Sequence, residues 1–192
     1  MHIAIEGMDG VGKTTTAKLV AEKLGFVFVD KPLHFLFDEN GYENYVRIRD
    51  IVNKSDNRLF TSWFYGLSNI YTYEIYKGQN IVTDRHFLSN YAWSGTDTNK
   101  EVYSLLIDKL GNPELTVILY ATPKTIQGRL MGRNAEDNDL TKVDMYEKKY
   151  CKMRQFCVDF GLNYIEIDTT SMQPKEIAEI IVSKAKECNV ND

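Results

Sequence analysis

The fold is decided near the N-terminus by residues 7–14, which read Gly7-Met8-Asp9-Gly10-Val11-Gly12-Lys13-Thr14. This stretch satisfies the pattern G-x-x-x-x-G-K-[ST], and it lies between a short apolar run and an amphipathic stretch. Glycines let the backbone curl so that successive N–H groups point inward, where they can bind phosphate oxygens. The helix expected to follow would add its positive N-terminus to the same site. The sequence therefore predicts a phosphate-binding loop (P-loop) between a strand and a helix.

The side chains of this loop have separate expected roles. Lys13 is expected to reach the β- and γ-phosphates of ATP, and the Thr14 hydroxyl to ligate Mg²⁺. Asp9 is unusual, because a carboxylate near triphosphate oxygens is repelled by them. It is either a solvated loop residue or it faces the acceptor, where it would hold a sugar hydroxyl or a metal-bound water, and we favour the second interpretation. The residues expected to bind ATP are Gly7, Met8, Asp9, Gly10, Val11, Gly12, Lys13, Thr14 and Thr15.

Short apolar runs alternate with longer amphipathic stretches along the whole chain. The expected strands are residues 3–5, 26–29, 81–83, 115–120 and 164–167. The expected helices are residues 14–24, 41–55, 58–77, 100–110, 143–160 and 174–187, with another beginning at 124–130. This alternation predicts an α/β fold, a five-stranded parallel sheet with helices on both faces in three layers. Residues 1–192 are expected to form a single domain, in which the polar stretch 132–142 is a mobile loop.

Composition restricts the partners. The 192 residues contain 23 Lys and Arg against 27 Asp and Glu, a formal net charge of −4, which argues against a bulk nucleic-acid-binding face. No apolar run approaches the ~18 residues that span a membrane. Three scattered cysteines form no metal-binding or disulfide pattern and suit a reducing compartment. We therefore expect a cytoplasmic protein with small-molecule partners, neither nucleic acid nor membrane.

Four stretches, in order along the chain, resemble the thymidylate kinase family, whose members phosphorylate dTMP. Residues 6–14 look like its E-G-x-[DE]-G-x-G-K-[ST], residues 84–93 (DRHFLSNYAW) like D-R-[YH]-x-x-S-x-x-A-Y, and residues 113–123 (PELTVILYATP) like P-x-L-T-x-x-L-x-x-x-P. Arg129 and Arg133 match the R-x-x-x-R that opens the family's lid, here at about 130–142. The resemblance implies a P-loop nucleoside monophosphate kinase with ATP and Mg²⁺ as cofactors, a deoxynucleotide acceptor and a homodimer.

The residues of these motifs suit that chemistry on physical grounds as well. Asp84 is expected at the end of a central strand, where a carboxylate can organise Mg²⁺, and Arg85 beside it can clamp an acceptor phosphate through two hydrogen bonds. A surface ion pair is the alternative, but ligands of α/β sheets bind at this edge, which favours function. Arg129 and Arg133 lie one helical turn apart and can neutralise charge on the transferred phosphoryl group.

The resemblance also assigns acceptor-binding positions. It implies that Trp93 lies against the 2′ position of the sugar and favours deoxyribose, with Asn90 assisting by hydrogen bonding. Phe60 aligns with an aromatic residue that stacks on the acceptor base, although a core position is an equal alternative. Phe64 stands where the family has an arginine that bonds the thymine carbonyl.

Three departures from the family pattern concern the acceptor and the lid. The family's Arg-Glu-Pro is replaced by Asp30-Lys31-Pro32, the thymine-reading arginine by Phe64, and the later lid motif D-R-x-E is absent. The catalytic residues are therefore retained while base recognition is altered.

Three other functions remain to be weighed. A deoxynucleoside kinase of the same fold would phosphorylate a 5′-hydroxyl, but it usually has a Glu-Pro step where Lys31-Pro32 stands and Glu-Arg-Ser in place of residues 84–86. A GTPase is suggested by residues 53–56 (NKSD), which match N-K-x-D, but no strand precedes them. Retention of Lys13 and of the motif arginines disfavours a non-catalytic binding module. Phosphoryl transfer from ATP to a deoxynucleotide is the interpretation that we favour.

Overall fold

The computed structural model describes residues 1–190, which contain a five-stranded sheet in the order β2-β3-β1-β4-β5. Every neighbouring pair of strands is parallel. The strands are β1 (His2–Gly7), β2 (Val27–Val29), β3 (Ile81–Asp84), β4 (Leu115–Tyr120) and β5 (Tyr164–Asp168). The expected α/β fold and all five expected strands are confirmed.

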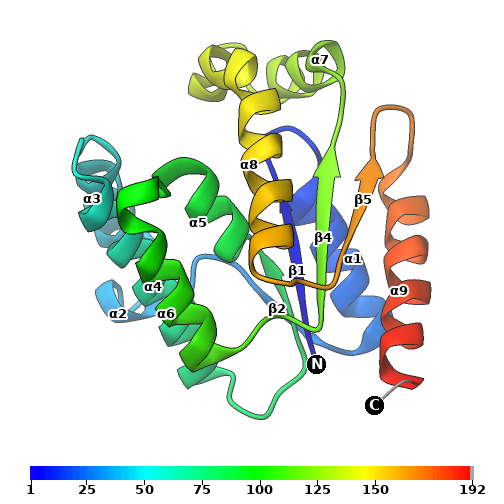
Figure 1. Cartoon of the computed structure of the whole chain (residues 1–192). Coiled ribbons are helices and arrows are strands. Elements are labelled where there is room, and N and C mark those ends of the chain that lie inside the picture. The colour runs from blue at the N-terminus through cyan, green and yellow to red at the C-terminus, as the bar shows by residue number, and fades with distance from the viewer. Residues whose placement is uncertain (191–192) are drawn as a thin grey trace.

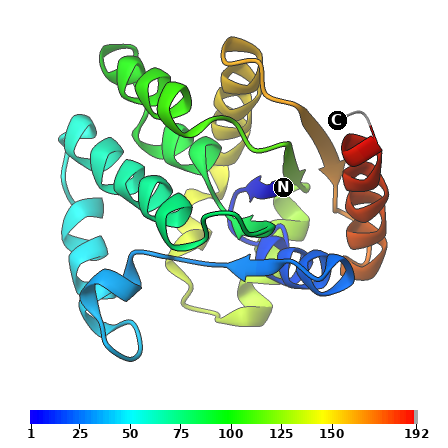
Figure 2. The ribbon, with the colours of Figure 1, turned by 90° about the horizontal axis from the view of Figure 1, so that it is seen from below.

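Helices cover both faces of this sheet (Figures 1 and 2). The α-helices are α1 (Lys13–Leu24), α2 (His34–Phe37), α3 (Glu43–Asn53), α4 (Arg58–Ile75), α5 (Phe87–Ser94), α6 (Lys100–Leu110), α7 (Pro123–Arg133), α8 (Tyr146–Asp159) and α9 (Pro174–Val190), and the 3-10 helices are η1 (Asp97–Asn99) and η2 (Asn138–Met145). Helices α1 and α9 pack together on one face, and α5 and α8 on the other, with α4 and α6 beyond α5. Within residues 1–190 no helix combines the length and the hydropathy that a membrane crossing requires.

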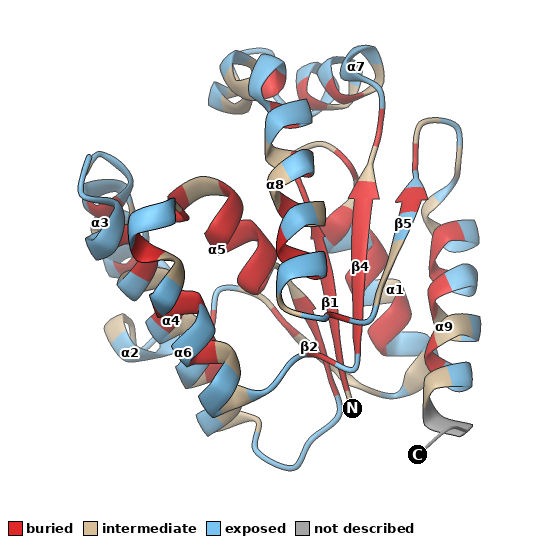
Figure 3. Cartoon of the chain, viewed as in Figure 1, coloured by how far each residue is buried: buried red, intermediate tan, exposed pale blue. Residues whose placement is uncertain are grey.

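The central strands β1 and β4 are buried on both sides, as Figure 3 shows. Continuous apolar runs are expected for parallel strands that helices cover on both faces. Buried polar side chains interrupt these runs at His2, Glu6 and Thr116, and the carboxylate of Glu6 is completely buried. Such a charge needs dedicated hydrogen-bond partners, and these are described below.

Two parts of the fold differ from the sequence-based expectation. Helix α5 has no amphipathic pattern because seven of its eight residues are buried, so its periodicity is invisible in the sequence. Residues 132–142, expected as an irregular loop, are partly ordered in η2. The Asp137 carboxylate accepts a hydrogen bond from the Asp139 N–H at the start of this helix, and Lys142 pairs with Asp139 at 2.7 Å. Local polar contacts thus order a segment that lacks apolar spacing.

Two buried histidines, on β1 and directly after β3, contact each other. Their rings are edge-to-face with centroids 4.7 Å apart. His2 on β1 is hydrogen-bonded through both ring nitrogens, at 2.9 Å to the Tyr73 hydroxyl and at 2.9 Å to the Thr83 hydroxyl. His86 follows β3, and neither of its buried ring nitrogens has a hydrogen-bond partner among the described residues. Burial lowers the pKa of His2 to about 3 and that of His86 well below 6.5.

Acid is therefore expected to destabilise the fold through these two rings. Below the unfolded value of 6.5, the unfolded chain binds protons that the folded chain excludes, so stability falls as the pH falls. Each histidine should remove about 1 kcal/mol of unfolding free energy between about pH 6.5 and pH 5.5, and the slope approaches about 1.4 kcal/mol per pH unit at lower pH. Urea denaturation between about pH 6.5 and pH 5.5 measures this slope. His86→Phe should halve the slope, and an unchanged slope would show that His86 is not the responsible group.

Candidate active site

The candidate site lies at the carboxyl edge of the sheet, where β1 leads into the P-loop and β3 ends at Asp84. Parallel strands end at one edge, so loops that are distant in the sequence meet there. Gly7 has a φ of 137°, and a Cβ atom on it would collide with the carbonyl oxygen of Leu119. Only glycine fits at this position. Because the loop joins β1 directly to α1, the strand–loop–helix context that the motif requires is confirmed.

Lys13 lies at the centre of the P-loop. It is only 6% exposed, and its Nζ donates a hydrogen bond to the Met8 carbonyl oxygen at 2.7 Å. The same Nζ is 3.9 Å from the Asp9 carboxylate. Burial, and then the charge of Arg85, lower the pKa of Lys13 to about 8. Met8 and Val11 are fully buried, so their side chains serve the core and only their backbone faces the loop.

Asp9 and Arg85 form an ion pair at the edge of the loop. Arg85 Nη2 donates to Asp9 Oδ1 at 2.6 Å, while Nη1 donates to the Ser89 hydroxyl at 3.1 Å and to the Gly7 carbonyl oxygen at 3.2 Å. Burial alone would raise the pKa of Asp9, but the charges of Arg85 and Lys13 hold it well below its usual range. Asp9 is therefore an ionised carboxylate that orients a guanidinium.

The donor set expected for Mg²⁺ is assembled. The Thr14 hydroxyl donates to Asp84 Oδ2, and Asp84 Oδ1 is buried without a hydrogen-bond partner among the described residues. Hydroxyl and carboxylate oxygens are the ligands that Mg²⁺ prefers, so these residues fit the ion. Thr15 is exposed beside them in the first turn of α1.

The two arginines of α7 have different partners. Arg129 donates to the Thr169 hydroxyl at 3.0 Å, to the Thr169 carbonyl at 2.6 Å and to the Gly10 carbonyl at 3.4 Å. It therefore joins α7 to the P-loop and to the loop after β5. Arg133 is exposed and pairs with Asp137, and with Asp139 at 3.2 Å. The two side chains, expected to serve one phosphoryl group, are thus held by different partners in this structure.

Comparison with known proteins decides the family. The family model described as thymidylate kinase matches residues 5–181. The chain belongs to the thymidylate kinase family. It is accordingly a nucleotide kinase, a phosphotransferase, as its motifs indicate.

Relatives within and around the thymidylate kinase family have different names. A protein from Thermococcus kodakarensis whose provisional name is adenylate kinase is 30% identical, over 95% of this chain and 84% of its own length. A thymidylate kinase from Caldanaerobacter subterraneus is 26% identical, over 96% and 94% of the two chains. A solved deoxyadenosine kinase from M. mycoides, with the products dCMP and a flexible dCDP bound, superposes with a TM-score of 0.67 at 18% identity, covering 97% of this chain and 100% of that one. This last likeness shows a common fold.

Two of the expected acceptor-binding residues, Phe60 and Asn90, differ in their surroundings. Phe60 is 47% exposed on α4, on the side opposite the buried residues of that helix. Asn90 is buried, and its amide is used within the fold, accepting from the Tyr103 hydroxyl at 3.0 Å and donating to the Ser62 carbonyl at 3.3 Å. The family pattern alone does not reveal the exposure of Phe60 or the hydrogen-bond partners of Asn90.

The other two positions are partly buried. Trp93 is half-buried at the end of α5, and Lys149 Nζ lies 4.4 Å from its ring centroid. Lys142 Nζ, at the end of the expected lid, lies 5.8 Å from the same ring. Phe64 is half-buried and makes an edge-to-face contact with Tyr65 at 5.3 Å. The Trp93 ring therefore lies against lysines of η2 and α8.

Three tyrosines that the sequence analysis missed interact electrostatically with Asp9 or Arg85. Burial raises the pKa of Tyr45 on α3 and of Tyr65 on α4, and the charge of Arg85 opposes this rise in both. Burial and the charge of Asp9 raise the pKa of Tyr146 on α8, whose buried hydroxyl has no partner among the described residues. A tyrosine ring is usually a core residue, so no signal in the sequence marked these side chains.

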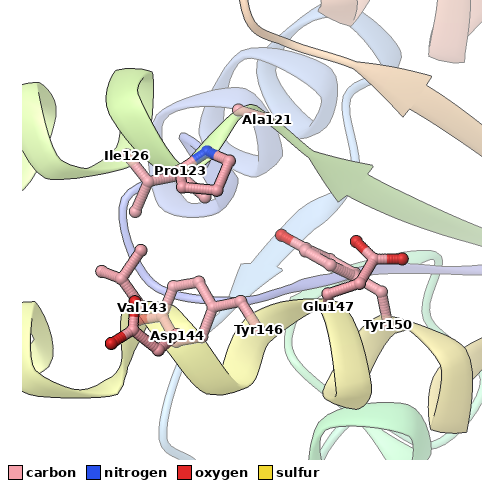
Figure 4. Close-up of a pocket in the computed structure, with 8 residues that line it drawn as sticks. All are labelled: Ala121, Pro123, Ile126, Val143, Asp144, Tyr146, Glu147 and Tyr150. Atoms are coloured by element: carbon pink, nitrogen blue, oxygen red, sulfur yellow. The ribbon is translucent and has the colours of Figure 1, made fainter.

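A cavity of about 240 Å³ lies between the end of β4, α7, η2 and α8 (Figure 4). Tyr146 and Tyr150 line it from α8, opposite Pro123 and Ile126 of α7. The other lining residues are Ala121, Val143, Asp144 and Glu147. Val143 and Asp144 of η2 directly follow the segment 130–142, so the cavity lies next to the end of the expected lid.

Proposed function

We propose that this kinase transfers the γ-phosphoryl group of ATP to a deoxynucleoside monophosphate, with dTMP as the best candidate. The observation that supports the proposal most directly is the Asp9–Arg85 pair beside the P-loop. An ATP-binding loop alone does not need a guanidinium held on its outer side. A kinase with a phosphorylated acceptor does, because a guanidinium binds phosphate through two parallel hydrogen bonds.

The roles of the chain's residues follow from their positions. Lys13 would neutralise charge on the β- and γ-phosphates, and Arg133 could join it after leaving Asp137. Arg85 would hold the acceptor phosphate in line for attack, which lowers the entropic part of the barrier. When bound at Thr14 and Asp84, Mg²⁺ would supply charge neutralisation between the phosphates. Closure of the lid, proposed at about 130–142, would exclude water and suppress hydrolysis of ATP.

A deoxynucleoside kinase activity is the second candidate. Asp30, at the end of β2, supplies a carboxylate near the place where such kinases carry theirs, and it pairs with Lys31 at 2.5 Å. A carboxylate there could accept the proton of an attacking 5′-hydroxyl.

One panel of acceptors tests both candidates. ATP would be incubated with each deoxynucleoside and with each ribo- and deoxynucleoside monophosphate, and ADP and product would be quantified. Phosphorylation of dTMP would support the proposal. Phosphorylation of another deoxynucleoside monophosphate would change the base, and phosphorylation of AMP alone would contradict a deoxynucleotide acceptor. Activity on nucleosides alone would favour the second candidate, and ATP hydrolysis without any acceptor dependence would contradict both.

A homodimer is also proposed, through the outer side of α4. This side presents five exposed apolar residues, each 40–50% exposed: Leu59, Phe60, Trp63, Leu67 and Ile70. Contiguous apolar surface of this kind marks an interaction site, and the family resemblance implies a second copy as the partner.

Leu67→Asp is expected to convert the dimer to a monomer, because it places a charge at the centre of this apolar surface. Light scattering after size exclusion measures the mass of each variant. Val158→Asp is the matched control, since Val158 is exposed on α8, outside the proposed interface. A monomeric wild-type chain, or a Leu67→Asp variant that remains dimeric, would contradict this interface.

A further inference from the structure

The buried carboxylate of Glu6 accepts four hydrogen bonds from the start of α5. Oε1 accepts from the N–H groups of His86 and Leu88, each at 2.9 Å. Oε2 accepts from the Ser89 N–H at 3.1 Å and from the Ser89 hydroxyl at 2.5 Å. A helix begins with N–H groups that have no partner within the helix, and here a side chain on another element, strand β1, supplies the acceptor. Glu6 is completely buried and therefore cannot contact a substrate itself.

The polarity of these bonds continues to Arg85. Burial raises the pKa of Glu6, while the hydrogen bonds from Ser89, Leu88 and His86 and the charge of Arg85 favour its ionised form. When ionised, the carboxylate can only accept, so Ser89 donates its single proton to Glu6. The lone pairs of Ser89 are then directed away from Glu6, and one accepts from Arg85 Nη1 at 3.1 Å. Glu6, Ser89 and Arg85 thus form a chain in which the direction of each hydrogen bond is determined by the first member.

The backbone of Arg85 is restrained by the same strand. Its N–H donates to the carbonyl oxygen of Ile5 at 2.9 Å, one residue before Glu6. Its φ is 76°, in the left-handed region that residues with a Cβ rarely adopt. Such a conformation persists only where surrounding contacts hold it. Here β1 holds the residue from both sides, through the backbone of Ile5 and through the carboxylate of Glu6.

We propose that Glu6 is a positioning residue that acts through Ser89 to fix the guanidinium of Arg85 beside Asp9 before the acceptor binds. The inference rests on the proposed function, in which Arg85 holds the acceptor phosphate. It explains why a carboxylate occupies a fully buried position in β1. A leucine at position 6 would leave three amide groups and the Ser89 hydroxyl without an acceptor, and Arg85 without its oriented partner.

Ser89→Ala tests the chain without removing the carboxylate. The KM for the acceptor that the wild-type enzyme uses should rise about tenfold, because one hydrogen bond to a charged group is lost. The KM for ATP should stay within about twofold, since Lys13 and the P-loop backbone are untouched. Ser94→Ala is the control, because Ser94 is equally buried on α5 but makes none of the bonds to Glu6 or Arg85.

A double-mutant cycle with Arg85→Ala separates positioning from a structural role. Acceptor binding, measured by calorimetry, needs no turnover and can be compared in all four proteins. If Ser89 acts through Arg85, Ser89→Ala should weaken binding by less than about twofold once Arg85 is alanine. An equal loss in both backgrounds would overturn the proposal.

Glu6→Gln supplies a second test, because an amide group has donors where the carboxylate has acceptors. Its NH₂ would oppose the Ser89 N–H, so the acceptor KM should rise as it does in Ser89→Ala, and the melting temperature should fall. A lowered melting temperature with an unchanged acceptor KM would overturn the proposal, and if this variant does not fold, the Ser89 cycle decides. Absence of wild-type turnover with every acceptor would instead contradict the proposed function.

Discussion

Lys13→Ala is expected to lower kcat by about a thousandfold, with the fold retained. Lys13 is nearly buried, and its ammonium is held inside the P-loop by the Met8 carbonyl oxygen. A charge in such a water-poor site interacts more strongly with developing negative charge than it would in solution. Its pKa of about 8 keeps it mostly protonated at neutral pH. The effect should therefore appear in kcat, measured as ADP formation with saturating ATP and acceptor.

The control for this variant is Lys23→Ala. Lys23 lies in the last turn of the same helix, where it is exposed and pairs with Glu179 at 3.6 Å. Surface ion pairs contribute little, so its kcat should stay within about twofold of wild type. Near-wild-type kcat in Lys13→Ala would show that the P-loop does not serve phosphoryl transfer in this chain.

Arg85→Ala is expected to reduce kcat/KM for the acceptor by about three powers of ten. The guanidinium is held by Asp9, Ser89 and the Gly7 carbonyl, so it is ordered without an acceptor. Removing it takes away a bidentate phosphate ligand and leaves Asp9 as a negative charge facing the acceptor phosphate. Both changes oppose acceptor binding, whereas the KM for ATP should change little.

Two further variants make the Arg85 result interpretable. Arg154→Ala is the control, because Arg154 pairs with Glu166 at 2.7 Å on the surface of α8. Asp9→Asn combined with Arg85→Ala should recover part of the lost acceptor affinity, since the unpaired carboxylate is gone. An acceptor KM that does not change in Arg85→Ala would mean that another residue binds the acceptor.

The sheet and the P-loop could be predicted from the sequence because both depend on short-range patterns. The apolar run of residues 115–120 indicates a buried parallel strand, and the glycine spacing of residues 7–14 specifies the loop between β1 and α1. The pairing of Asp9 with Arg85 was not predictable in the same way. It depends on β1 and β3 being neighbours, so that residues separated by most of the N-terminal half lie 2.6 Å apart.

Among the residues expected near the acceptor, a match to a motif does not specify which side chains surround a residue. Asn90 lies within the stretch that resembles the family motif, yet its amide is hydrogen-bonded to Tyr103 and Ser62. Tyr146 matches no motif, yet its hydroxyl is buried and the charge of Asp9 helps burial to raise its pKa. The surroundings of each side chain depend on which helices pack on the sheet and where along the strands they lie. Residues from the whole chain determine that packing.

The P-loop backbone is also held by side chains from the C-terminal part of the chain. The Gly10 carbonyl accepts from Arg129, and the Val11 carbonyl accepts at 3.1 Å from the Thr169 hydroxyl, 158 positions further on. During synthesis, domains emerge from the ribosome N-terminal end first, and contacts this distant close late. The motif that is translated first therefore stays incomplete until nearly the whole chain has emerged. A nascent or truncated chain would carry the P-loop sequence without the finished nucleotide site.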